Sequence, residues 1–282
     1  MRVATHPNDP GDGIAMMDII VCVKQVVDPE AEPVNFKVDS GAKRMTTQAG
    51  VKLVVDPYAE YAVEAALKIK DAKGGKVTAI SLGPNQVRDV VKKPLAMGAD
   101  DLVLLEDMAF ADGDSWSTAY ALATAIKKIG RYDLILCGRE SSDWNAGQVG
   151  SGIGEILGLP SVTLATGIGI DDAKATVKRI AGDGYEVLEV SLPAVITVSN
   201  EIGTPRYSAV SRVLAAAKKQ PIIWKPAEIG VTAAQIGALG RRMKLVKLFQ
   251  PVHEGRCQIA EGKSPEEAAV NLFLKLREAK VL

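Results

Sequence analysis

The alternation of short apolar runs with helix-like segments constrains the fold of this chain more than any other feature. Continuous runs rich in Val, Ile and Leu, without polar alternation, are typical of parallel strands that are covered on both faces. Such runs lie at 18–25, 76–82, 101–106 and 133–138. Because helix-like segments separate them, the order predicts an α/β fold, a doubly wound and mostly parallel sheet with right-handed crossovers.

The helix-like segments carry recognisable start and stop signals. Segment 57–72 begins with proline, and Asp56 stands before it as a cap candidate. Segment 84–97 begins in the same way, and we expect Pro94 to break it. Segment 115–129 ends with two lysines before a glycine, which is typical of a helix C-terminus.

The chain changes character after its first half. Extended runs follow at 161–168, 174–181, 185–191 and 193–199. Polar and Gly-containing turns separate the first three, which we expect to form an antiparallel ribbon at one edge of the sheet. An earlier insertion, 33–50, contains an Asp-Ser-Gly turn between extended runs and predicts a hairpin.

These patterns divide the chain into three parts. Residues 1–16 contain Pro, Gly and Asp but lack the apolar core of a signal peptide, so we expect a disordered leader or a misassigned start. The α/β domain spans 17–217. Residues 218–282 are expected to form an extended arm, whose last part, 264–282, has a Ser cap, a Pro and amphipathic spacing.

Composition excludes several classes of function. The 34 basic and 34 acidic residues balance, without the basic excess of a nucleic-acid binder. No apolar run reaches the ~18 residues that a membrane span needs. Three widely spaced cysteines (Cys22, Cys137 and Cys257) fit a reducing cytoplasm. With His6 and His253 as the only histidines, we predict neither a metal site nor a catalytic triad.

A stretch of small and polar residues, 138–152, follows the fourth strand run. In an open parallel sheet, ligands bind outside the carboxyl ends of the strands, where the strand order reverses. Small residues let backbone amides approach a ligand, and the next helix turns its free N–H groups toward a phosphate. The stretch matches no standard phosphate-binding motif, so it predicts only a nucleotide-like anion. The alternative is a surface loop whose glycines merely permit tight packing.

Individual side chains near this stretch leave two interpretations open. Lys24 can reach a phosphate or be a solvated residue at a strand end. Glu140 or Asp143 can act as an acid, although carboxylates beside such loops more often cap helices or bind ribose hydroxyls. Tyr58 can stack on a ring or pack against its neighbours. No catalytic residue is assigned.

Six segments occur in an order that is typical of one known family. They are VCVKQVVDPEA (21–31), DPYAEYAVEAAL (56–67), AISLGP (79–84), LAMGAD (95–100), CGRESSDWNAGQVG (137–150) and VKRIAGDGYEVLEVSLPAVITVSNEIGTPRYSAV (177–210). On these segments the chain resembles the small, or beta, subunit of electron-transfer flavoproteins, across about 17–215. The last segment is the most specific of the six.

The resemblance implies a heterodimer in which a larger alpha subunit holds most of a redox-active FAD, and on which the arm 218–282 of this chain packs. The beta subunit has a Rossmann-like, adenine-nucleotide-binding fold, forms one wall of the flavin site and buries a nucleotide of its own. That nucleotide is AMP in ordinary members and a second FAD in members that bifurcate electrons from NADH. The expected partner is a flavin dehydrogenase such as an acyl-CoA dehydrogenase, and the role is that of an electron carrier rather than a self-sufficient catalyst.

The resemblance also places the site residues. The cofactor-binding positions are Cys22, Asp56, Pro57, Tyr58, Ala59, Ala79, Leu82, Gly138, Arg139, Glu140, Ser141, Ser142, Asp143, Trp144, Asn145, Ala146, Gly147, Gln148 and Val149. Tyr58 is expected near the flavin of the alpha subunit. The partner-docking positions are Arg206, Tyr207 and Val210.

The chain departs from the family pattern at three of these places. Family members often carry leucine at the position of Val210, and many have Asn where Asp56 stands. The Asp-rich part of their loop is replaced here by Ser142-Asp143-Trp144-Asn145.

Three functions therefore stay open on the sequence. The first is an electron carrier with AMP that passes electrons from acyl-CoA dehydrogenases to a membrane quinone reductase. The second is an electron-bifurcating, NADH-oxidising subunit with its own FAD. The third is a stand-alone adenine-nucleotide-binding module, and the segment 177–210 argues against it.

Overall fold

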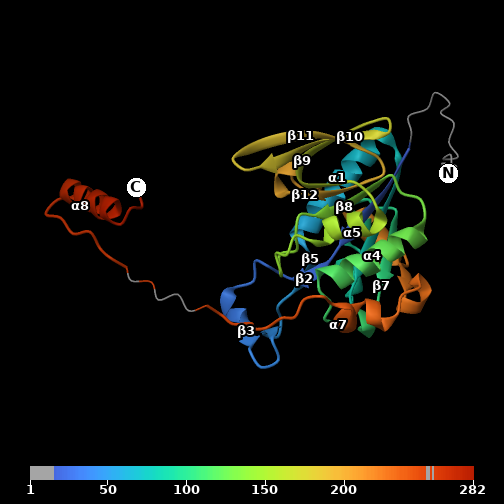
Figure 1. The fold of residues 1–282 in the computed structure, drawn as a ribbon, viewed down its shortest axis with the longest axis horizontal. Coiled ribbons are helices and arrows are strands. Elements are labelled where there is room, and N and C mark those ends of the chain that lie inside the picture. Colours follow the sequence, from blue (N-terminus) through green and yellow to red (C-terminus); the bar gives the residue numbers. More distant parts are fainter. Residues whose placement is uncertain (1–15, 252–254, 256) are drawn as a thin grey trace. The chain divides into compact units, whose positions relative to one another are not determined.

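A computed structural model describes residues 16–251, 255 and 257–282 (Figure 1). Of the predicted leader, only Met16 is among the described residues. Both histidines lie outside them. The chain divides into two compact units. One contains the central sheet with its covering helices and extends to Val246, and the other comprises Val38–Met45 and Lys247–Leu282. The packing of 218–282 on a second subunit stays a prediction.

Within the described residues, the central sheet has nine strands in the order β11-β10-β9-β12-β8-β1-β6-β7-β13. Seven of them pair in parallel: β1 (Met17–Val23), β6 (Gly75–Leu82), β7 (Asp101–Leu105), β8 (Leu134–Gly138), β9 (Ser161–Asp171), β12 (Ala194–Val198) and β13 (Ile222–Trp224). The antiparallel strands β10 (Lys174–Ala181) and β11 (Gly184–Ser191) extend β9 into an edge ribbon. The predicted α/β class, the mostly parallel sheet and the ribbon are confirmed.

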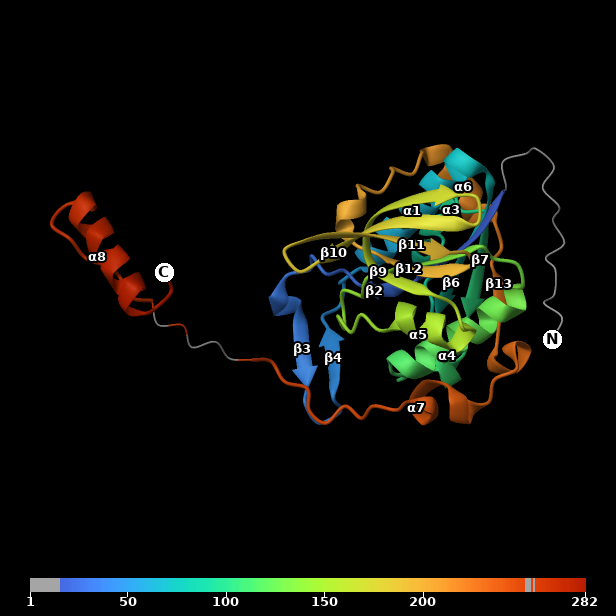
Figure 2. The same cartoon turned by 45° about the horizontal axis from the view of Figure 1, so that its top comes forward.

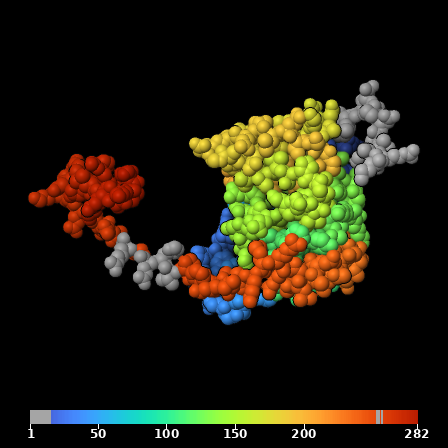
Figure 3. Space-filling model, in the orientation of Figure 1, coloured from blue at the N-terminus to red at the C-terminus, as the bar shows by residue number. Residues whose placement is uncertain are grey.

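Helices cover both faces of the sheet, which is why its central strands are apolar throughout (Figure 2). On one face, α1 (Pro57–Lys73), α3 (Lys93–Met97) and α6 (Val210–Lys218) share an apolar cluster with Ile19 and Val21 of β1. On the other face, α4 (Ser115–Ile129) and α5 (Val149–Leu157) share a second cluster with Ile20. Figure 3 shows this second face, with the ribbon along one side and the segment after β13 along the other.

The predicted helix signals act where the sequence places them. Asp56 caps α1 by accepting a hydrogen bond from the Tyr58 amide at 2.9 Å. At the start of α4, Asp114 and Ser117 form a reciprocal capping box, a signal that the sequence analysis did not identify. Ser264 caps α8 (Pro265–Glu278), the helix expected at the end of the chain. A side-chain cap therefore stabilises the start of each of these three helices.

Three expectations need correction. The first strand run does not continue to residue 25 but ends at Val23, and β2 (Gln25–Val27) pairs instead with β5 (Leu53–Val55). Residues 84–87 are not helical, because the amides of Gln86 and Val87 donate to side chains from other strand ends. The helix appears only as α2 (Arg88–Val91), before α3. The segment expected to leave the domain after residue 217 adds β13 to the sheet.

The remaining elements are short. The predicted hairpin is formed by β3 (Phe36–Asp39) and β4 (Arg44–Thr47). The others are η1 (Pro33–Asn35), η2 (Met108–Phe110), η3 (Asn200–Ile202), η4 (Pro226–Ile229), η5 (Ala233–Gln235) and α7 (Gly237–Gly240).

Candidate functional site

The strand order reverses between β1 and β8. After β1 the chain proceeds to β6 and β7 on one side of it, and then returns to β8 and β12 on the other side. The carboxyl ends of β1 and β8 therefore flank the crevice in which doubly wound sheets bind their ligands. The loop 139–148, which follows β8, lies at this place and joins the sheet to α5.

Asp56 connects the start of α1 with this loop. Its side chain is buried, and one carboxylate oxygen (Oδ1) caps α1. The other oxygen (Oδ2) accepts hydrogen bonds from the Ser142 amide at 2.7 Å and from the Ser142 hydroxyl at 2.8 Å. A buried carboxylate needs such donors because it has lost its water, so Asp56 fixes the helix and the loop together.

Lys24 fastens the same loop to the end of β1. Its Nζ lies 2.6 Å from Asp143 Oδ1 and 3.3 Å from Ser141 Oγ. The lysine is thus neither a lone cation nor a freely solvated one. Its position at the crevice leaves it able to face an anion bound there.

Gly138 permits a close contact between β8 and α1. A Cβ atom at this position would lie 2.7 Å from Tyr58 Cβ and 2.8 Å from the Tyr58 carbonyl carbon. The Tyr58 ring in turn carries the Arg139 guanidinium 5.4 Å from its centroid. Arg139 also pairs with Glu140 at 3.1 Å. Tyr58 is therefore a packing residue of the crevice wall in this structure, half-buried beneath a cation.

The first turn of α5 has no side-chain cap. The amides of Val149, Gly150 and Ser151 have no hydrogen-bond acceptor among the described residues. Gly147 precedes them at φ +62°, and a Cβ on Gly150 would lie 2.4 Å from Thr197 Cγ2. Glycine at position 150 therefore lets α5 begin close to the sheet. Free amides at the start of such a helix fit a phosphate group.

Buried polar atoms without partners lie at the same edge of the sheet. Ser81 Oγ, near the end of β6, and Gln86 Oε1, in the loop that follows, lack a partner among the described residues. A polar ligand over this edge fits the hydrogen-bonding capacity that these two groups leave unused.

The structure places the sequence-predicted residues in three groups. In the first, Ser142 binds Asp56, Arg139 lies over Tyr58 and pairs with Glu140, and Lys24 holds Ser141 and Asp143. Trp144 to Gln148 are exposed on the outer part of the loop. Ala79 is fully buried under α1, whereas Leu82 packs against the opposite cluster.

Two cysteines lie beneath the crevice. Cys22 of β1 and Cys137 of β8 are direct neighbours across the two strands. A hydrogen bond with Cys137, together with burial, raises the pKa of the Cys22 thiol well above its usual value. The Cys22 thiol therefore stays protonated at neutral pH and serves as a small apolar side chain.

The positions predicted to dock a partner lie in and directly after the segment 203–209, which has no regular secondary structure. Tyr207 is fully exposed, and Val210 is 76% exposed at the start of α6. Arg206 instead points its guanidinium to Glu64 and Asp71 of α1.

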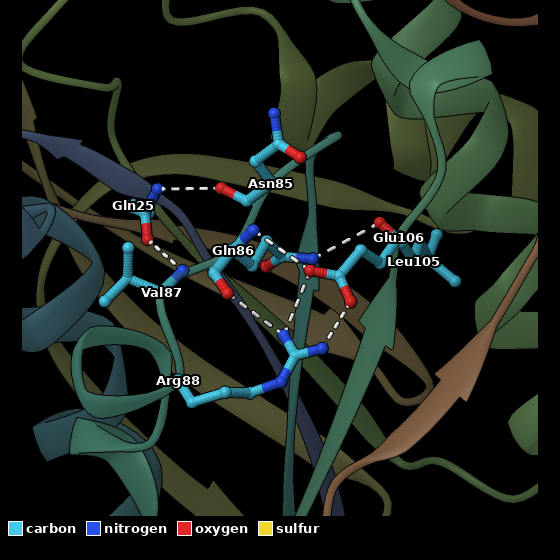
Figure 4. A network of polar contacts seen from close by, with 7 residues as sticks. All are labelled: Gln25, Asn85, Gln86, Val87, Arg88, Leu105 and Glu106. Atoms are coloured by element: carbon cyan, nitrogen blue, oxygen red, sulfur yellow. Dashed lines mark hydrogen bonds and ion pairs between the residues drawn. The ribbon is translucent and has the colours of Figure 1, made fainter.

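Sequence reasoning missed a polar network that fixes the loop after β6 (Figure 4). The side chain of Gln25 donates from Nε2 to the Asn85 backbone carbonyl at 3.2 Å. Its Oε1 accepts a hydrogen bond from the Val87 backbone amide at 2.7 Å. Glu106, at the end of β7, accepts from the Gln86 amide and pairs with Arg88. Each of these polar residues follows a strand end, and that placement is the signal that could have found them.

The ion pair of this network predicts a pH-dependent stability. Arg88, and then the Gln86 amide, hold the pKa of Glu106 below its ordinary value. The stabilisation is therefore complete above the ordinary glutamate pKa of about 4.3, and it is lost as the pH falls through the lowered value in the folded protein. Glu106→Gln should reduce stability at pH 7, and the gap to the wild type should close in acid.

Urea unfolding at several pH values measures this gap. Glu189→Gln is the matched control, because it breaks the exposed ion pair with Lys174, and it should have little effect at any pH. If the free energies of unfolding of Glu106→Gln and the wild type differ by the same amount at pH 7 and pH 3, the assigned ion pair is contradicted.

Two absences bear on the class of site. Within the described parts of the chain, no group of three or more His, Cys, Asp or Glu side chains could hold a metal ion. None of the helices found there has the length and apolar character that crossing a membrane requires.

Comparisons with known proteins agree with this geometry. A model of the electron transfer flavoprotein domain matches residues 45–229. The chain is 37% identical over 267 residues to the caffeyl-CoA reductase-Etf complex subunit CarD of Acetobacterium woodii. The aligned region covers 94% of this chain and 100% of that protein. It is 36% identical over 262 residues to the electron transfer flavoprotein subunit beta of Clostridium acetobutylicum, with 93% and 98% covered.

A third relative is the acryloyl-CoA reductase electron transfer subunit gamma of Anaerotignum propionicum, 32% identical over 273 residues, with 94% of this chain and 100% of that protein covered. On this evidence the chain belongs to the electron transfer flavoprotein family.

Proposed function

We propose that this chain is the beta subunit of a heterodimeric electron transfer flavoprotein with AMP as its structural nucleotide. It carries electrons from flavin dehydrogenases of the acyl-CoA dehydrogenase type to a quinone reductase. The observation that carries the proposal is the uncapped start of α5 behind a loop that Asp56 and Lys24 hold at the reversal of strand order. We place the protein in the cytoplasm, because its three cysteines are free in the structure.

The residues fit a nucleotide that is held rather than hydrolysed. The amides of Val149 to Ser151 would receive the phosphate, and Lys24 would balance its charge. Asp56 would keep the loop in place, and Tyr58 with Arg139 would form the wall toward the alpha subunit. A flavin, when bound, supplies the redox chemistry, and the chain needs no acid or base of its own for this role.

Two surfaces support the expected partners. The segment from Arg206 to Val210 is our candidate for docking a dehydrogenase. The helix α8 exposes a run of apolar residues, Val270 and Leu272 to Leu274, which an alpha subunit would cover.

The names of two relatives favour a second candidate function. Caffeyl-CoA reductase-Etf complex subunit CarD and acryloyl-CoA reductase electron transfer subunit gamma both belong, by name, with acyl-CoA reductases. A partner that reduces an acyl-CoA suits a subunit that bifurcates electrons from NADH. In that case a second FAD takes the place of AMP.

Nucleotide counting tests the proposal. The chain is co-expressed with its alpha subunit, the heterodimer is purified, and the extracted nucleotides are quantified by chromatography. We expect one FAD and one AMP per heterodimer. Two FAD and no AMP would replace the first candidate with the second. A colourless, monomeric chain without nucleotide, even in the presence of the alpha subunit, would overturn both.

A further inference from the structure

Arg206 is anchored inside the chain by an acid that is itself buried. Its backbone amide donates to Glu64 Oε2 at 3.0 Å, its Nε donates to the same oxygen at 2.8 Å, and its Nη2 donates to Glu64 Oε1 at 3.2 Å. The same Nη2 donates to Asp71 Oδ2 at 2.8 Å. Main chain and side chain of one residue are thus held by two carboxylates of α1.

The anchor is strong because Glu64 has little contact with water. Its side chain is 5% exposed, and Arg206 supplies every hydrogen bond to its carboxylate that the described residues show. A buried carboxylate that loses its guanidinium keeps the cost of its lost hydration, so the pair holds the segment firmly. Hydrogen bonds to Glu64, and then to Asp71, raise the pKa of Arg206, so its guanidinium stays charged.

An apolar surface begins directly after the anchor. Tyr207 is fully exposed, and Val210, Val213 and Leu214 are 76%, 46% and 60% exposed. A second fixed point follows within α6, where Arg212 donates to the Met97 carbonyl of α3 at 3.1 Å. Tyr207 and Val210 therefore lie between two arginine contacts to the body of the domain, and Val213 and Leu214 follow directly after the second.

We propose that Arg206 is a positioning residue, which through Glu64 fixes the orientation of the surface formed by Tyr207, Val210, Val213 and Leu214 for a flavin dehydrogenase. The inference rests on the proposed function. Arg206 acts through the position of the segment, because its backbone amide, Nε and Nη2 all donate to carboxylates of α1. Tyrosine and aliphatic side chains on a fixed backbone bind with less loss of conformational freedom than the same side chains on a loose segment.

Arg206→Lys is the test variant, because lysine keeps the charge but cannot make the two-pronged contact. Arg131→Lys is the matched control, since it alters the exposed pair with Asp18 in another part of the domain. Hydrogen–deuterium exchange of the purified heterodimer is measured first. We expect faster exchange across 203–214 in Arg206→Lys and unchanged exchange in the loop 139–148. Unchanged exchange across 203–214 would overturn the inference.

Electron transfer with a purified acyl-CoA dehydrogenase is measured next. We expect the KM for the dehydrogenase to rise about tenfold with kcat nearly unchanged, because the surface is still present but no longer fixed. Val210→Ala should also raise the KM, and in the double variant the two effects should fall short of their product.

The remaining outcomes separate the inference from the function on which it rests. Faster exchange with an unchanged KM, or effects that multiply fully, would overturn the positioning role. A wild-type heterodimer that does not react with the dehydrogenase would instead refute the proposed partner class. The exchange measurement would then decide alone whether Arg206 fixes the segment.

Discussion

Gly138→Val is expected to lower the free energy of unfolding by about 3 kcal/mol, the upper end of typical overpacking effects. The new Cβ would lie 2.7 Å from Tyr58 Cβ and 2.8 Å from its carbonyl carbon, so β8 and α1 would have to separate. Separation also pulls Asp56 away from Ser142, whose hydrogen bonds to it are 2.7 and 2.8 Å long. The heterodimer should therefore lose its nucleotide as well as its stability.

Urea unfolding and the nucleotide content of the purified heterodimer measure the two effects. Gly167→Val is the matched control, because a Cβ there meets only Lys178 Cβ at 3.7 Å, an ordinary contact. Valine also suits a strand, so this control should change stability by less than about 1 kcal/mol. A Gly138→Val protein with normal stability and a full nucleotide complement would refute the close contact.

Asp56→Ala should cost about 3 kcal/mol, of which the lost helix cap accounts for about 1 kcal/mol and the lost hydrogen bonds from Ser142 for the rest. Both carboxylate oxygens are in use, one at α1 and one at the loop. The loop should lose its anchor, and nucleotide retention should fall with it.

Two further variants divide the contributions. Asp56→Asn leaves one acceptor oxygen, so the side chain can accept from α1 or from the loop but not from both. The stability of this variant should lie midway between that of Asp56→Ala and that of the wild type. Ser142→Ala removes only the hydroxyl and keeps the hydrogen bond that the backbone amide of residue 142 donates to Asp56. Thermal unfolding and nucleotide content are the measurements, and an Asp56→Asn protein as unstable as Asp56→Ala would contradict the two-sided role.

The sequence alone predicts the parts of the fold that depend on neighbouring residues. Apolar runs without alternation identify the central strands because both faces of the sheet are covered. Asp56 is recognisable as a helix cap because the cap acts on an amide two residues away. The place of the loop 139–148 also follows, since parallel strands meet at one edge of the sheet.

The parts that were not predicted depend on contacts between distant residues. Arg206 and Glu64 are 142 positions apart, so no local pattern indicates that the arginine is used inside the chain. Gln86 and Glu106 are closer in sequence, but their contact exists only because β6 and β7 are neighbours. The strand β13 has three residues, too few for periodicity to identify it.

The residue that caps α1, Asp56, holds the loop 139–148, and Glu64 in the middle of α1 holds Arg206. Substitutions along α1 should therefore alter cofactor retention and partner preference together. Among residues 207–214, only Arg212 also holds another part of the domain, through the Met97 carbonyl. On the proposed function, a redesign toward a different redox partner can be confined to these exposed positions, with α1 and the loop 139–148 left as they are.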